Sequence, residues 1–205
     1  VVGKKTEKEK FAGAEYTLTV EALMQNGICL QSATSHYFGQ KFAKAYDVKF
    51  VNKDNKFEYC YQTSWGSTTR MIGALIMVHG DDKGLVLPPK IAPKEVCIVP
   101  IRMEDNVLDV ANKLKQDGIE AYIDNSEKSP GYKFAEAEVL GIPVRIEIGP
   151  RDLINNEVTL VRRDTSEKIN VKVDEVNAKV KELLNDIQNS LYNKALENQK
   201  NKTFY

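Results

Sequence analysis

A proline-rich segment near the middle of the chain limits its possible folds more than any other feature. The segment reads LPPKIAP from Leu87 to Pro93 and holds three of the seven prolines in the 205 residues. Proline fixes its own φ and restricts the residue before it, so this stretch should be extended and stiff. At roughly 100–200 residues per domain, the length allows two small domains. We therefore expect a first domain over residues 1–87, a linker at 88–93 and a second domain over residues 94–205.

The residues before this segment carry mainly strand signals. Apolar and polar residues alternate over 15–23, and residues 48–51 and 57–61 flank a polar turn in the manner of a hairpin. A short helix is expected over 38–46, and a longer amphipathic helix is expected to begin near Ser67. This half should form an antiparallel sheet with a helix packed on it.

Strands and helices alternate after the segment. Strands are expected at 95–101, 119–123, 142–148, 157–162 and 169–173, with helices at 106–116, at 129–141 and from Asp174 onward. Ser129 has the character of an N-cap before Pro130, and Gly118 is a stop signal. Alternating elements predict a mixed, mainly parallel sheet with helices on its faces, so the fold class is α/β here and α+β overall.

Composition excludes several classes of protein. The chain has 29 Lys+Arg and 29 Asp+Glu residues, and this zero net charge argues against gripping nucleic acid, DNA included, by bulk electrostatics. The longest apolar stretch, residues 71–78, is far shorter than the roughly 20 residues of a membrane helix. The first residues lack the pattern of a basic start, an apolar run and a small-residue cleavage site, so we do not expect secretion. The three cysteines are far apart, which argues against a disulfide framework or a zinc site and favours the cytoplasm.

Three polar clusters could carry chemistry: residues 31–36, 62–70 and 79–84. In the second cluster, Arg70 is expected one turn inside a helix, and a helix N-terminus with an arginine suits phosphate. Trp65 could face a cation, although it could equally be a core residue beside an Arg70 that forms a surface ion pair. His36 is expected at the start of a helix, where it could be structural. The third cluster suggests either a metal site or a glycine-framed turn.

Several long motifs run through the chain. They read EKEKFAGAEYTLTVEAL from residue 7, TSHYFGQKFAKAYDVKF from residue 34, QTSWGSTTRMIGALIMVHGDDKGLVLPPKIAP from residue 62, EVCIVPI from residue 95 and SPGYKFAEAEVLGIPVRIEIGPRDL from residue 129. These motifs resemble the prolyl-tRNA synthetase family of archaea, eukaryotes and some bacteria. The last two resemble its anticodon-binding domain.

The resemblance implies a class II aminoacyl-tRNA synthetase that activates proline with ATP and Mg²⁺ and transfers it to tRNA(Pro). The motif around residue 70 is similar to the third signature motif of the class. The implied ATP contacts are Gln31, Thr34, Thr68 and Arg70. The implied proline contacts are His36, Ser64, Trp65 and Gly66. Such a reaction needs no side-chain nucleophile, so positioning and charge neutralisation should carry the catalysis.

The resemblance also implies that the second domain reads the anticodon of tRNA(Pro). Glu138 and Arg145 match base-reading positions, and a carboxylate and a guanidinium suit the edges of guanine. Lys133 and Arg151 are the expected phosphate contacts. Without the family, Glu138 and Arg145 would read as an intramolecular ion pair.

The sequence departs from the family in what it lacks. The first two class II motifs and the C-terminal domain that often binds zinc are not in these 205 residues. We expect a fragment of a homodimeric enzyme that is inactive alone and holds no zinc. A natural stand-alone tRNA-binding module is the alternative, and another class II synthetase with the same anticodon-binding fold is a third reading.

Overall fold

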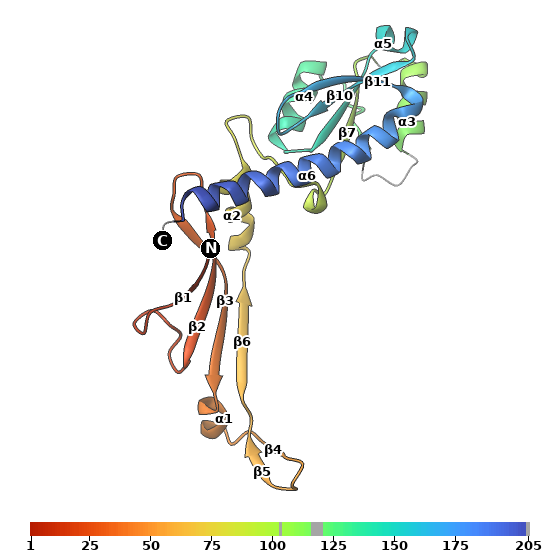
Figure 1. Cartoon of the computed structure of the whole chain (residues 1–205). Helices are drawn as coiled ribbons and strands as arrows, with labels where there is room; N and C mark the ends of the chain where they lie inside the picture. Colours follow the sequence, from red (N-terminus) through yellow and green to blue (C-terminus); the bar gives the residue numbers. More distant parts are fainter. Residues whose placement is uncertain (103, 116–120, 204–205) are drawn as a thin grey trace. The chain divides into compact units, whose positions relative to one another are not determined.

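The chain forms two compact units, Val1–Val78 and His79–Tyr205 (Figure 1). The computed structural model describes residues 1–102, 104–115 and 121–203. Within these ranges, none of the helices is both long and apolar enough to cross a membrane.

The first unit is built on an antiparallel sheet with the strand order β1-β2-β3-β6. Its strands are β1 (Val2–Lys4), β2 (Tyr16–Leu23), β3 (Cys29–Gly39) and β6 (Gln62–Ser67). A short helix, α1 (Lys41–Ala45), and a hairpin of β4 (Lys49–Val51) and β5 (Phe57–Tyr59) stand between β3 and β6, and α2 (Arg70–His79) follows β6. The predicted strand at 15–23 and the predicted hairpin are confirmed.

Three local expectations in this unit are wrong. His36 does not start a helix, because it lies within β3, which pairs with β2 on one side and β6 on the other. The short helix begins at Lys41, since β3 extends to Gly39. The long helix begins at Arg70, since Ser67 still pairs with Ala33 in the sheet. Arg70 is therefore the first residue of α2 and does not lie one turn inside it.

A β-bulge changes which side chains of β3 share a face. Opposite Val20 and Glu21 of β2 stand Ala33 and Gln31, and Ser32 is left without an opposite residue. Strict alternation would send Gln31 and Thr34 to different faces of the sheet. The extra residue corrects this offset and brings Gln31 to the face of Thr34.

The second unit is a five-stranded mixed sheet with the strand order β11-β10-β9-β7-β8. Its strands are β7 (Val96–Pro100), β8 (Ala121–Ile123), β9 (Val144–Ile148), β10 (Glu157–Arg162) and β11 (Lys168–Lys172). Strand β7 is parallel to β8 and β9, whereas β10 is antiparallel to β9 and β11. The helices are α3 (Asp105–Lys115), α4 (Pro130–Val139), α5 (Pro150–Ile154) and α6 (Val176–Asn201), with single 3₁₀ turns at Pro89–Ile91 and Val173–Glu175.

The core of this unit lies where α6 covers the sheet. Every residue of β7 and β9 is buried, as expected for strands covered on both faces. The predicted apolar stripe of α6 is buried at Val176, Val180, Leu183, Leu184, Ile187 and Leu191. Ser129 is confirmed as the N-cap of α4, because its side chain accepts a hydrogen bond from Tyr132 N–H. The expected helix stop at Gly118 lies outside the described residues.

The segment between α2 and β7 packs on the second unit. The backbone N–H groups of Leu85 and Leu87 donate to the carbonyls of Val139 and Gly141 at the end of α4. Further along, Pro89 is buried and Lys90 N–H donates to Gln188 of α6. The second unit therefore begins at His79, ahead of the proline-rich segment in which the sequence predicts a linker.

Candidate functional site

One face of the first unit's sheet is lined with polar side chains. His36 of β3 sits at its centre, with Nδ1 2.8 Å from the buried Thr17 hydroxyl and Nε2 3.2 Å from the Thr34 hydroxyl. The rings of Phe11 and Phe38 flank the imidazole at centroid distances of 5.1 and 6.0 Å. Both ring nitrogens are thus engaged, and the orientation of His36 is fixed from two strands.

Strand pairing brings most of the predicted ligand contacts to this same face. Ser64 and Gly66 of β6 stand directly opposite His36 and Thr34, and opposite residues in an antiparallel pair share a face. The bulge adds Gln31, whose side-chain carbonyl accepts a hydrogen bond from Lys5 Nζ at 2.7 Å. Gly66 leaves this surface open, because a Cβ there would lie 3.7 Å from the Thr34 hydroxyl.

Trp65 lies on the opposite face. It pairs with Ser35, which pairs in turn with Leu18 of β2, so these three side chains alternate away from His36. Trp65 is 79% exposed and is not a core residue of this chain. The structure therefore does not bring Trp65 together with the other predicted proline contacts.

Arg70 opens α2 immediately after this sheet. Its backbone N–H donates to the Thr68 hydroxyl at 3.3 Å, so Thr68 occupies one of the unpaired donors of the helix start. The Arg70 side chain is exposed, and within the described part of the chain it forms no ion pair. The guanidinium is thus available for an anion such as a phosphate.

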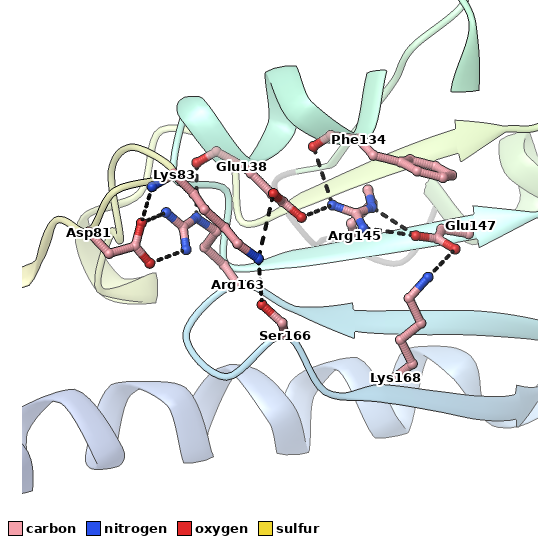
Figure 2. Close-up of polar contacts among 9 residues, drawn as sticks. All are labelled: Asp81, Lys83, Phe134, Glu138, Arg145, Glu147, Arg163, Ser166 and Lys168. Atoms are coloured by element: carbon pink, nitrogen blue, oxygen red, sulfur yellow. Dashed lines mark hydrogen bonds and ion pairs between the residues drawn. The ribbon is translucent and has the colours of Figure 1, made fainter. Parts of the chain in front are cut away.

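A chain of alternating charges crosses the second unit, as Figure 2 shows. At its centre, Arg145 of β9 is 6% exposed and donates from Nε and Nη2 to one oxygen of Glu147, at 3.0 and 2.9 Å. Its Nη1 donates to Glu138 Oε1 and to the Phe134 carbonyl, both at 3.3 Å. These bonds occupy four of the five N–H donors of the guanidinium. Arg145 is therefore chiefly the clamp that holds two carboxylates.

The two carboxylates each meet a second cation. Glu138 Oε2 lies 4.0 Å from Lys83 Nζ, and Glu147 Oε2 lies 3.3 Å from Lys168 Nζ. A small pocket borders the cluster and is lined by Ala137, Glu138, Ile142, Arg145, Val161, Arg162 and Arg163. The ion pair that the sequence left open between Glu138 and Arg145 is present in the structure.

Sequence reasoning missed three members of this cluster. Phe134 stacks under Arg145, with the guanidinium carbon 4.5 Å from the ring centroid, and Lys168 Nζ lies 6.0 Å from the same ring. Glu147 is the third. Spacing carried a signal for two of them: Phe134 and Glu138 are four residues apart on one helix face, and Arg145 and Glu147 are two apart on one strand face. Lys168 comes from another strand, and no local spacing points to it.

The two predicted phosphate contacts differ in accessibility. Lys133 is buried in α4, and its ammonium donates to the Asp124 carbonyl at 2.9 Å with an Asp124 carboxylate oxygen 4.0 Å away. Arg151 lies in α5 and is exposed. Only Arg151 is presented to solvent.

The third cluster of the sequence is a turn held by an arginine. Asp81 and Gly84 form a small bridge, and the guanidinium of Arg163 binds both carboxylate oxygens of Asp81. This pairing lowers the pKa of Asp81 from 3.8 to about 2. Among the described residues, no group of three acidic, histidine or cysteine side chains could hold a metal ion.

Comparisons with known proteins find likenesses in both units of the chain. Residues 95–183 match the family model described as an anticodon binding domain. The whole chain is 51% identical to a proline–tRNA ligase of Lachnospira eligens and 53% identical to one of Mycoplasma mycoides subsp. mycoides, and it covers 44% of each. A solved structure of prolyl-tRNA synthetase from Cryptosporidium parvum, complexed with L-proline and AMP, matches 98% of the chain with a TM-score of 0.92 and 41% identity.

The chain spans less than half the length of these relatives, because it covers 45% of the Cryptosporidium chain and 44% of the bacterial proteins. The likeness nevertheless extends over both units. The chain thus resembles prolyl-tRNA synthetases over its whole length, and residues 95–183 of its second unit match the model of an anticodon binding domain.

Proposed function

We propose that the chain supplies the anticodon-reading domain and part of the proline-activating site of a prolyl-tRNA synthetase. The observation that carries the proposal is the charged cluster around Glu138 and Arg145, which lies inside the matched anticodon-binding region. In the complete enzyme, a proline carboxylate oxygen attacks the α-phosphorus of ATP, and pyrophosphate leaves. The terminal adenosine hydroxyl of tRNA(Pro) then attacks the carbonyl of prolyl-adenylate, and AMP leaves.

In this proposal the polar face of the first unit binds the small substrates. Gln31, Thr34 and Thr68 contact the nucleotide, and Arg70 neutralises phosphate charge as it develops. His36, Ser64 and Gly66 contact proline. We leave Trp65 out of this pocket, because its strand position points it to the other face. Proline and AMP are the ligands named for the Cryptosporidium relative.

Magnesium enters the proposal with ATP. Mg²⁺ is usually held by substrate phosphates together with one or two carboxylates, which fits a chain whose described residues contain no dedicated cage of metal ligands. On arrival it would neutralise phosphate charge beside Arg70. We further propose that the complete enzyme is a cytoplasmic homodimer, as the family resemblance implies.

In the second unit, Glu138 is proposed to accept hydrogen bonds from the N1 and N2 edge of an anticodon guanine. Loop bases are accessible to such contacts, unlike bases within an RNA helix. Arg145 acts through the carboxylates that it holds, together with its one remaining donor. Arg151 is available to a phosphate, whereas Lys133 would first have to release the Asp124 carbonyl.

Binding of a synthetic anticodon hairpin tests this proposal. Glu138→Gln should weaken binding of a hairpin with the two guanines of the proline anticodon by about 1–3 kcal/mol in fluorescence anisotropy. Glu136→Gln is the matched control, because Glu136 lies on the same helix and, among the described residues, its side chain pairs with Lys128 at the surface. If wild type binds hairpins with adenine in place of guanine equally well, the proposal is refuted.

Proline-dependent ATP–pyrophosphate exchange tests the activation half. We expect no turnover by the 205 residues alone, and turnover by a chain extended to the length of its relatives. Sustained exchange by the 205 residues would contradict the proposal that they form only part of the proline-activating site. Hairpin binding without exchange in the extended chain would favour a stand-alone tRNA-binding module.

A further inference from the structure

Arg163 is a buried cation clamped from two directions. It directly follows β10, and its Nη1 and Nη2 donate to the two carboxylate oxygens of Asp81 at 2.8 and 2.5 Å. Its Nε donates at 2.9 Å to the backbone carbonyl of Glu138, near the C-terminal end of α4. Arg163 therefore links the turn after α2 to the helix residue whose carboxylate we propose reads a base (Figure 2).

The turn that contains Asp81 also places the Lys83 side chain beside the carboxylate of Glu138. Asp81 Oδ1 accepts a hydrogen bond from Lys83 N–H at 2.9 Å, which fixes the backbone of Lys83. The Lys83 ammonium then donates to the Ser166 hydroxyl at 3.1 Å and lies 4.0 Å from Glu138 Oε2. Arg145 occupies the other oxygen of Glu138 at 3.3 Å. Both oxygens of this carboxylate thus face a positioned cation.

Backbone contacts prevent the turn from shifting. Gly84 has φ +135°, and a Cβ on it would lie 2.5 Å from the Cα of Val139, the last residue of α4. Gly141 has φ +70°, and a Cβ there would lie 2.6 Å from the Leu85 Cβ. The turn and the end of α4 are therefore in direct backbone contact, so a displacement of Asp81 or Lys83 would be felt at Glu138.

We infer that Asp81, Lys83 and Arg163 are positioning residues that set the carboxylate of Glu138 for the N1 and N2 donors of a guanine. The inference rests on the proposed function of Glu138. Two of these residues, Asp81 and Lys83, precede the matched anticodon-binding region, which begins at residue 95. Guanine recognition thus depends on a turn that follows α2 and lies outside that domain.

Replacing guanine with inosine in the anticodon hairpin isolates this effect, because inosine lacks only the N2 amine. For wild type, the dissociation constant for the inosine hairpin should exceed that for the guanine hairpin by about 5–150-fold, the value of one specific base contact. In Asp81→Asn and Lys83→Met this ratio should fall toward one. Asp82→Asn is the matched control, since Asp82 is an exposed neighbour in the same turn, and it should keep the wild-type ratio.

The ratio of the two dissociation constants separates positioning from stability. A merely structural loss would weaken both hairpins equally and leave the ratio unchanged. If Asp81→Asn fails to fold, Lys83→Met decides, because its side chain is half exposed and removes no buried charge. An unchanged ratio in folded Lys83→Met overturns the inference. A wild type that does not distinguish guanine from adenine hairpins refutes the proposed function first, and the inference with it.

Discussion

Arg163 and Asp81 form a bidentate ion pair between turns that lie 82 residues apart in the sequence. The pair is asymmetric, because the side chain of Arg163 is 3% exposed whereas that of Asp81 is 44% exposed. Water can reach the carboxylate but hardly reaches the cation. Asp81 therefore works mainly as the counter-charge that lets Arg163 stay buried next to the end of α4.

This pair should make stability depend on pH in the acid range. Arg163 lowers the pKa of Asp81 from 3.8 to about 2 in the folded chain. A lowered pKa contributes stability that is fully present above 3.8 and is lost as the pH falls toward 2. The loss in unfolding free energy caused by Asp81→Asn should thus be constant at higher pH and shrink between these values. Thermal unfolding at a series of pH values measures it, and a constant gap down to pH 2 would contradict the assignment.

Gly84→Ala should strongly destabilise the second unit. The new Cβ would collide with the backbone of Val139, and the positive φ of Gly84 is itself unfavourable for alanine. Gly131→Ala is the matched control, because it lies in the first turn of α4 with no atom within 4 Å of the new Cβ. The control should raise stability by about 0.4–1 kcal/mol. Urea unfolding of both variants compares them, and similar values for the two would be incompatible with the close approach.

Arg145→Ala should lower the unfolding free energy of the chain in addition to removing an RNA contact. It would leave the carboxylates of Glu138 and Glu147 near each other without their shared cation, and breaking a buried pair in this way costs about 3–5 kcal/mol. Arg151→Ala, at an exposed position, should change the unfolding free energy by no more than about 0.5 kcal/mol. Chemical denaturation of the free chain checks both values without RNA. Equal stability of the two variants would mean that Arg145 does not hold the two carboxylates together.

The three cysteines should differ in their reactivity toward thiol reagents. Burial raises the pKa of Cys97 to about 11, while Cys29 is exposed and Cys60 is partly exposed. Because the thiolate is the reactive form, Cys29 should be alkylated first at neutral pH and Cys97 only after unfolding. Peptide mass spectrometry after a timed alkylation gives the order. Early modification of Cys97 in folded chain would show that its strand opens.

Trp65 is the single tryptophan of the chain, so intrinsic fluorescence reports on it alone. Its exposure predicts emission like that of tryptophan in water, with ready quenching by iodide. Trp65→Ala should leave the unfolding free energy within about 0.5 kcal/mol of wild type. A protected, blue-shifted emission in the 205-residue chain would show that this face of the sheet is covered.

Local sequence patterns predicted the helices and strands that depend on residues close together in the chain. The Ser129 cap, the apolar run of β7 and the stripe of α6 belong to this class, because capping and periodic burial act over one or two turns. The error at His36 has the opposite cause. Its strand is defined by partners in β2 and β6, which lie 19 and 28 residues away along the chain, and no local pattern contains them.

The site residues also divide into those that the sequence indicates and those that only contacts between distant segments bring in. Glu138 and Arg145 were assigned by resemblance and meet in the structure, whereas Lys83, Arg163 and Lys168 join them through chain reversals that the sequence pattern does not reveal. The face occupied by Trp65 could have been found from strict alternation with Ser64 and Gly66. That inference needs the strand to be recognised as regular up to Ser67, which only its pairing with Ala33 establishes.

Because Ser32 has no opposite residue in β2, strand β3 could lose this residue and keep its pairing with β2. A chain that had lost Ser32 would run without the bulge and still set Gln31 opposite Glu21 and Ala33 opposite Val20. Loss of one residue between Thr34 and Tyr37 would instead turn every side chain on one flank of the deletion to the other face. Loss of Ser32 would therefore keep the small-molecule contacts on one face, whereas a deletion between Thr34 and Tyr37 would divide them between the two sides of the sheet.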